Sequence, residues 1–318
     1  MSMFSSKPFH QIETSFTNVE NRQTINQTIG ESKEITPLFI YSSGDNITGE
    51  VKIKIKNSKK LEYRNISIAF IGQIELTYDP GNPTIFITEK VLVAKGGVLT
   101  GTNNYSFNFQ RKRMRYESYK GTNVNLRYFV RVIIDRNIST TYSQDKDFWV
   151  MNVMKPPLEN PPINIKVGLK SDLNIDITLE QSQFHLTDVI KGIVNYYIVK
   201  IQFKSMGLSI IKREITKSNS GMNQNIFTEN ETIAKFEIMD GAPVQGDKIP
   251  IRFFLRSLNL TPTFPQINNI FSVRYFLNLV LVDKKEKRYF RETELVLYRN
   301  ALPEKKPILI KKELSSDK

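Results

Sequence analysis

FSVRYFLNLVLVD, at Phe271–Asp283, has a counterpart in the first half of the chain, VNLRYFVRVIID at Val124–Asp135. Both segments place Arg-Tyr-Phe ahead of apolar residues and end on Asp, and their starts lie 147 positions apart. Two further pairs of similar segments occur in the same order at similar offsets, Thr48–Ile55 with Lys191–Val199 and Ile66–Glu75 with Met206–Ile215. The repetition predicts one domain plan that is used twice in tandem.

The pattern around these segments is typical of β-strands. VKIKIK, at Val51–Lys56, alternates strictly and places its three apolar side chains on one face and its three lysines on the other. Short segments of this kind are separated by turn residues every 8–12 positions or so, which predicts an all-β fold of two tandem antiparallel β-sandwiches. The best helix candidate is the short Phe264–Ile270 region, although it contains Pro265.

A proline-rich segment separates the two halves. Lys155–Pro162, KPPLENPP, holds four of the 14 prolines. Proline fixes φ and cannot donate a hydrogen bond to a sheet, so this segment is expected to be a stiff connector. The expected organisation is a flexible N-terminus at 1–8, a sandwich at 9–154, the linker at 155–162, a second sandwich at 163–301 and a charged tail at 302–318.

Composition argues against enzymatic chemistry. The chain has 318 residues, enough for two domains, but no cysteine and only two histidines, His10 and His185, each isolated in the sequence. Phosphate-binding and nucleophile motifs are missing from the sequence as well. We therefore predict that the protein is not an enzyme and that it has no cofactor or metal.

The net charge of +13 makes an acidic partner conceivable, but most lysines and arginines alternate with apolar residues, which favours a solvated basic face. The densest basic cluster comprises Arg111, Lys112, Arg113 and Arg115. A nucleic-acid platform would interleave such residues with exposed aromatic side chains, and this cluster matches that pattern only weakly. We predict no nucleic-acid partner.

One segment suggests a binding site. In Glu231–Leu255, period-two alternation places Ile238 on the inner face of a strand and Met239 on the outer, charged face, immediately before the turn residues Asp240 and Gly241. The alternation by itself slightly favours Met239 as a gap filler at the strand end over a contact with a partner.

Several segments identify a family. The chain resembles the arrestin-like small subunit of retromer, the vacuolar-protein-sorting family twenty-six. The resemblance covers about residues 37–300 and is carried by FIGQIELT at Phe70–Thr77, YESYKGTNVNLRYF at Tyr116–Phe129, KREIT at Lys212–Thr216, ETIAKFEIMDGAPVQGDKIPIRFFL at Glu231–Leu255, FSVRYFLNLVLVD at Phe271–Asp283, and the strand from Arg288-Tyr289-Phe290 to Arg299.

The resemblance implies a bilobed arrestin fold and a non-enzymatic coat component in the cytoplasm, on the cytosolic face of endosomes. It implies that the second domain docks on the large α-solenoid subunit, and that sorting nexins and the cytosolic tails of cargo proteins are further partners. The residues that it assigns to the solenoid contact are Ile238, Met239, Asp240, Gly241 and Val244.

Two departures from the family pattern matter. The run Arg111-Lys112-Arg113 is unusual, and we predict that it and Arg115 make indirect or weak membrane contact. Ser43 stands where relatives can carry an acidic residue for a PDZ-bearing sorting nexin, which argues against that partner. The alternatives are an arrestin-domain adaptor for a ubiquitin ligase, whose PPxY motif is missing here, and a nucleic-acid-binding β-sandwich.

Overall fold

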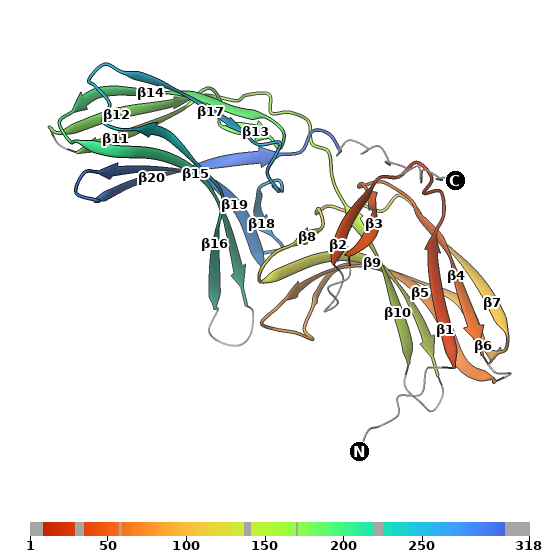
Figure 1. Ribbon diagram of the computed structural model, residues 1–318. Coiled ribbons are helices and arrows are strands. Elements are labelled where there is room, and N and C mark those ends of the chain that lie inside the picture. The colour runs from red at the N-terminus through yellow and green to blue at the C-terminus, as the bar shows by residue number, and fades with distance from the viewer. Residues whose placement is uncertain are drawn as a thin grey trace, which may run out of the picture.

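Two lobes of β-strands make up the protein (Figure 1), which we describe from a computed structural model. The described residues are 9–28, 35–56, 59–136, 141–169, 171–218 and 225–302. All regular structure in these ranges is β-strand, and each lobe has two sheets, so the predicted tandem β-sandwich fold is confirmed. The predicted flexible N-terminus and almost all of the predicted tail lie outside the described residues.

The N-terminal lobe packs a three-stranded sheet against a seven-stranded sheet. The small sheet has the order β1-β4-β7, with bounds His10–Phe16, Ile47–Ile55 and Thr102–Phe109. The large sheet has the order β2-β3-β10-β9-β5-β6, with β8 paired to β9; its bounds are Thr24–Thr28, Ile35–Tyr41, Tyr142–Val150, Val124–Asp135, Leu61–Leu76, Thr84–Leu99 and Tyr119–Lys120. Val51, Ile53 and Ile55 of β4 are buried between the sheets, as the alternation predicts.

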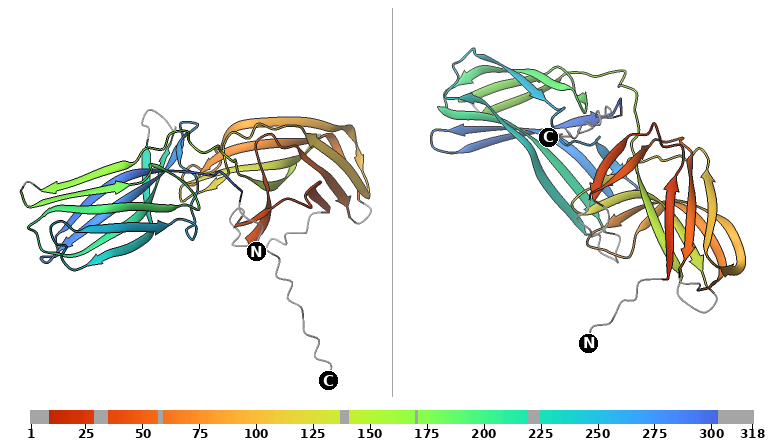
Figure 2. Two further views of the ribbon diagram at one scale, coloured as in Figure 1. Left: turned by 90° about the horizontal axis from the view of Figure 1, so that it is seen from above. Right: turned by 45° about the vertical axis from the view of Figure 1, so that its right-hand side comes forward.

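The C-terminal lobe pairs a four-stranded sheet with a six-stranded sheet (Figure 2). The smaller sheet has the order β11-β12-β14-β17, with bounds Ile163–Leu169, Leu173–Leu179, Val189–Val199 and Lys248–Phe254. The larger sheet has the order β13-β20-β19-β15-β16, with β18 paired to β19; its bounds are Gln183–His185, Arg288–Tyr298, Phe271–Asp283, Phe203–Lys217, Ile226–Asp240 and Phe264–Ile267.

The two lobes repeat one topology, and all three pairs of similar segments fall on matching strands. β9 and β19 are the central strands of the large sheets, β5 and β15 are their neighbours, and β4 and β14 hold matching places in the small sheets. Each lobe also contains one parallel pair among its described strands, β3 with β10 and β13 with β20. The sandwiches are therefore antiparallel except at these two strands.

The repeated Arg-Tyr-Phe has a structural role in both lobes. The tyrosines, Tyr128 and Tyr275, are fully buried. The hydroxyl of Tyr128 donates to the carbonyl of Tyr116 at 2.9 Å, and that of Tyr275 accepts from the N–H of Thr261 at 3.0 Å. Each bond holds the loop that leads into the short side strand, β8 or β18. Burial raises the pKa of Tyr128, so this hydroxyl stays a donor at neutral pH.

The best helix candidate of the sequence, the Phe264–Ile270 region, forms no helix. Phe264–Ile267 forms β18, which pairs with β19 through Phe264 opposite Val273, and a turn follows it. Pro265 is compatible with this short side strand, because proline is tolerated at strand edges and disfavoured inside helices.

Residues 151–162 connect the lobes without regular structure, since β10 ends at Val150 and β11 begins at Ile163. Leu158 in this segment is fully exposed. The domain boundaries at the Pro-rich segment stay a prediction.

Candidate partner-binding site

The loop between β16 and β17 projects from one end of the C-terminal lobe and is held at both of its glycines. Gly241 and Gly246 have φ of +101° and +94°, a backbone conformation that L side chains rarely adopt. The N–H of Gly241 donates to the carbonyl of Lys204, and that of Gly246 to the carbonyl of Tyr196, both at 2.7 Å. The loop therefore has a fixed shape.

Val244 is the exposed large apolar side chain of this loop, with an exposed fraction of 68%. Its N–H donates to the Asp247 carboxylate at 2.7 Å, and its carbonyl accepts from the N–H of Asp247 at 3.1 Å. The side chain points away from the core while its backbone is fixed. Asp240, at the end of β16, is exposed nearby.

Ile238 packs against the core, as alternation predicts, but Met239 does not take the outward face that alternation predicts. A β-bulge at Ile238 puts Met239 opposite the buried Met206, so Met239 shares the inner face of the sheet. The hydroxyl of Tyr196 lies 2.8 Å from the sulfur of Met206 and 3.9 Å from that of Met239. Both Ile238 and Met239 are half-buried against the core, so the outward placement of Met239 is wrong.

β17 alternates regularly. Ile251 and Phe253, with Leu255 just after the strand, are buried, while Arg252 and Phe254 are exposed. Among the residues assigned to the solenoid contact, Asp240 and Val244 are thus exposed, whereas Ile238, Met239 and Gly241 are partly buried.

The basic cluster lies in the loop after β7, in the other lobe. This loop is tied to the turn at Gly44–Asn46: the N–H of Arg111 donates to Oδ1 of Asn46 at 2.7 Å, and that of Lys112 to the carbonyl of Asp45 at 3.0 Å. Lys112 forms an ion pair with Glu89.

The cations of this cluster are not equivalent. Arg115 lies over the ring of Tyr116, with 5.6 Å from Cζ to the ring centroid. Arg111 and Arg113 are exposed, and neither has an acidic partner among the described residues. Met114, between Arg113 and Arg115, is buried and anchors the loop. Of the four basic residues in this cluster, Arg111 and Arg113 are thus available to bind an external anion.

A buried ion pair, which the sequence analysis did not predict, joins the two lobes. Glu117 and Arg299, each about 8% exposed, form a buried ion pair with both carboxylate oxygens within 3.3 Å of the guanidinium. The N–H of Asn152 also donates to Glu117, at 3.0 Å. Burial raises the pKa of Glu117, and the guanidinium of Arg299 opposes that rise.

A second carboxylate, that of Glu214 on β15, holds the adjacent loop of the N-terminal lobe. It accepts hydrogen bonds from the hydroxyl of Tyr119 at 2.7 Å, the N–H of Asn123 at 2.7 Å and the N–H of Thr122 at 3.2 Å. The ring of Tyr119 stacks on Phe271, with centroids 5.7 Å apart. No local signal reveals these contacts, because the partners lie 95 residues apart in the Tyr119 pair and 182 apart in the Glu117 pair.

Within the described ranges, no group of three or more metal-binding side chains is placed to hold an ion. The same ranges contain no helix that is long and apolar enough to cross a membrane. His185 is buried, and its Nδ1 lies 2.9 Å from the hydroxyl of Thr187.

Comparison with known proteins gives one consistent result. The family model for vacuolar protein sorting-associated protein 26 matches residues 6–286. The vacuolar protein sorting-associated protein 26 of Dictyostelium discoideum is 43% identical over 292 residues, which is 92% of this chain and 82% of that protein. The human vacuolar protein sorting-associated protein 26B is 41% identical over 300 residues, 94% of this chain and 88% of that protein.

Proposed function

The chain belongs to the vacuolar protein sorting-associated protein 26 family, and from this premise we propose that it is a non-enzymatic subunit of the retromer coat. In this proposal it acts in the cytoplasm, on the cytosolic face of endosomes, where sorting nexins and the tails of cargo proteins are its further partners. The names of its relatives support a role in protein sorting.

The β16–β17 loop is the proposed docking site for the large α-solenoid subunit. The observation that carries this assignment is an exposed apolar side chain, Val244, on a loop whose backbone is fixed by hydrogen bonds. Such a side chain loses little conformational entropy on binding and desolvates readily, as interface anchors require. Met239 supports the loop from beneath, through its contact with Tyr196.

Val244→Asp should weaken binding of the α-solenoid subunit by on the order of a hundredfold, because it buries an unpaired carboxylate in the interface. The melting temperature should stay unchanged, since this side chain is exposed. Titration calorimetry with the purified subunit measures the first effect and thermal unfolding the second.

The matched control is Val98→Asp, a similarly exposed valine on β6 of the other lobe, which should bind normally. Normal binding by Val244→Asp would remove the loop from the interface. Met239→Asp is the less informative variant, because it should lower both affinity and stability.

The basic loop after β7 is the proposed membrane-facing element. The double variant Arg111→Gln and Arg113→Gln should weaken binding to phosphatidylserine vesicles by about tenfold or more, at roughly 1 kcal/mol for each basic residue near the surface. Added salt should reduce the difference.

The control for this prediction is the double variant Lys52→Gln and Lys56→Gln, which removes the same charge from exposed positions at β4. Co-sedimentation with vesicles measures all of these proteins. If both double variants lose the same amount of vesicle binding, the attraction depends on overall charge, and this loop has no specific role.

A further inference from the structure

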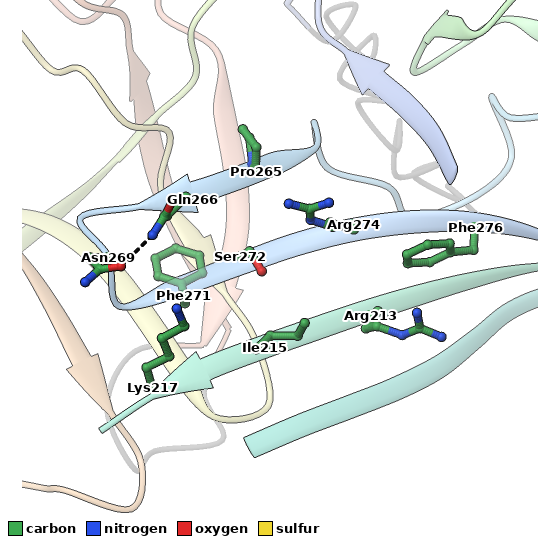
Figure 3. A pocket seen from close by; sticks show the side chains of 10 residues that line it. All are labelled: Arg213, Ile215, Lys217, Pro265, Gln266, Asn269, Phe271, Ser272, Arg274 and Phe276. Atoms are coloured by element: carbon green, nitrogen blue, oxygen red, sulfur yellow. Dashed lines mark hydrogen bonds between the residues drawn. The ribbon is translucent and has the colours of Figure 1, made fainter. Parts of the chain in front are cut away.

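A cavity of about 390 Å³ opens on the outer face of the large sheet of the C-terminal lobe (Figure 3). Its floor is formed by alternate side chains of two neighbouring strands, Arg213, Ile215 and Lys217 on β15 and Ser272, Arg274 and Phe276 on β19. Gln266 on β18 closes one side. Cationic, amide and apolar groups therefore face one opening.

The repeat supplies an internal comparison for this cavity. In the N-terminal lobe Arg127 lies opposite Gln73 on the neighbouring strand, whereas in the C-terminal lobe the matching Arg274 lies opposite Arg213. Two residues further along the strand, the N-terminal lobe has Glu75 where the C-terminal lobe has Ile215. The acid of one lobe is replaced by an apolar residue in the other.

The N-terminal counterpart of the cavity is closed and neutralised. Arg127 donates to both oxygens of Asp147, at 2.7 and 3.0 Å, and also reaches Asp145 and Glu75. Arg131 pairs with Asp145 at 2.7 Å. The cavity beside Glu75 and Arg127 has a volume of only about 70 Å³. Three carboxylates thus face two guanidinium groups there.

On the matching face of the C-terminal lobe, basic side chains outnumber the acidic ones. Arg274 pairs with Glu294 at 3.2 Å and Arg213 with Glu292 at 2.9 Å, so both arginines are compensated. Lys217 has no side-chain hydrogen bond or ion pair within the part of the chain that the structure describes. Its N–H donates to the carbonyl of Ile270, and at the matching position of the other lobe the N–H of Thr77 donates to the carbonyl of Asn123. The face therefore gains a free cation where the repeat has a threonine.

We propose that this cavity binds an acidic peptide segment. Lys217 holds one carboxylate of the peptide, and a neighbouring apolar side chain packs on Ile215. The uncompensated ammonium group gives the site its charge preference, and charge-assisted hydrogen bonds of this kind are among the stronger ones in proteins. The volume suits one or two peptide side chains.

This site is separate from the proposed solenoid contact. Met239 lies opposite Met206 near the start of β15, while Lys217 ends the same strand. At about 3.3 Å per residue, Met206 and Lys217 are roughly 36 Å apart along β15. The inference therefore does not rest on the proposed function, and each can fail without the other.

The test uses the full chain and a fluorescein-labelled peptide of sequence Glu-Phe-Glu-Leu-Glu, with binding followed by fluorescence anisotropy. Lys217→Gln should weaken binding by about tenfold, the usual effect of losing a hydrogen bond to a charged group. Ile215→Glu, which installs the acid found at Glu75 of the other lobe, should weaken it at least as much. Lys191→Gln, at an exposed position on β14 in the opposite sheet, is the matched control and should bind within twofold of the unmodified protein.

Several outcomes would overturn the proposal. One is equal binding of a peptide in which every Glu is replaced by Gln, and others are no saturable binding at all or equal losses in Lys217→Gln and Lys191→Gln. If Lys217→Gln weakens binding to phosphatidylserine vesicles but not binding to the peptide, the site recognises a lipid surface instead. Melting temperatures check that each variant is folded, and Lys217→Gln decides alone if Ile215→Glu unfolds.

Discussion

Arg299→Ala should lower the free energy of unfolding by about 3–5 kcal/mol, because it leaves the buried carboxylate of Glu117 without its partner. Chemical denaturation followed by circular dichroism measures the loss. Arg213→Ala is the matched control, since it removes an arginine from a more exposed ion pair, with Glu292, and should cost far less.

The loss in Arg299→Ala should depend on pH in a defined direction. Without the guanidinium, burial acts on Glu117 with less opposition, so its folded pKa lies above the value of about 4.3 in an unfolded chain. The folded state then binds this proton more tightly, so the variant gains stability as pH falls. The deficit should therefore be smaller near about pH 5 than near about pH 8.

A double variant separates the ion pair from general packing. Glu117→Gln combined with Arg299→Ala removes the stranded charge and should recover part of the stability lost in Arg299→Ala. If Arg299→Ala is as stable as the unmodified protein, or if its deficit grows at low pH, the buried ion pair does not act as described.

The sequence was most informative where structure depends on alternation within one strand. The buried set Val51, Ile53 and Ile55 follows from period two, and the repeated Arg-Tyr-Phe marks the central strand of each large sheet. The motif repeats because its tyrosine must reach a loop from inside each lobe, at Tyr116 in one and Thr261 in the other. A physical requirement that recurs in both halves leaves a trace in the sequence.

Alternation failed where the strand is irregular. A bulge adds one residue to one strand only, so the count of inward and outward positions shifts beyond it. The bulge at Ile238 therefore moves Met239 to the inner face, and nothing in the sequence there announces it. The residues assigned to the solenoid contact differ in exposure: Val244 is exposed, whereas Met239 is half-buried and lies against Tyr196.

Long-range contacts were invisible for a different reason. β18 becomes a strand only because β19 pairs with it, and its own residues are too few to show a period. The pairs Glu117 with Arg299 and Tyr119 with Glu214 join residues from different lobes. A single sequence shows these residues but not which of them pair in the folded protein.

Glu214→Ala should separate the lobes without unfolding either one. The carboxylate is 3% exposed and accepts three hydrogen bonds from the N-terminal lobe, two of them from backbone N–H groups of the Tyr119–Asn123 loop. Hydrogen bonds to a charged group contribute about 1.5–3 kcal/mol each, and the gain from no longer burying a charge offsets part of their loss. We expect docking of the lobes to weaken by about 3 kcal/mol, while the strands within each lobe keep their own pairing.

Three measurements distinguish separation of the lobes from unfolding. In Glu214→Ala the radius of gyration from small-angle scattering should rise, cleavage within Lys155–Pro162 by an added protease should be faster, and the circular dichroism spectrum should stay that of β-sheet. Glu214→Gln keeps one carbonyl acceptor, so its radius of gyration and cleavage rate should lie between those of Glu214→Ala and those of the unmodified protein. The control is Glu229→Ala, because Glu229 contacts the same loop at Asn123 from an exposed position and at 3.5 Å, so its removal should change nothing measurable. An unchanged scattering profile and cleavage rate in Glu214→Ala would mean that the stacking of Tyr119 on Phe271 and the ion pair of Glu117 hold the lobes together without this carboxylate.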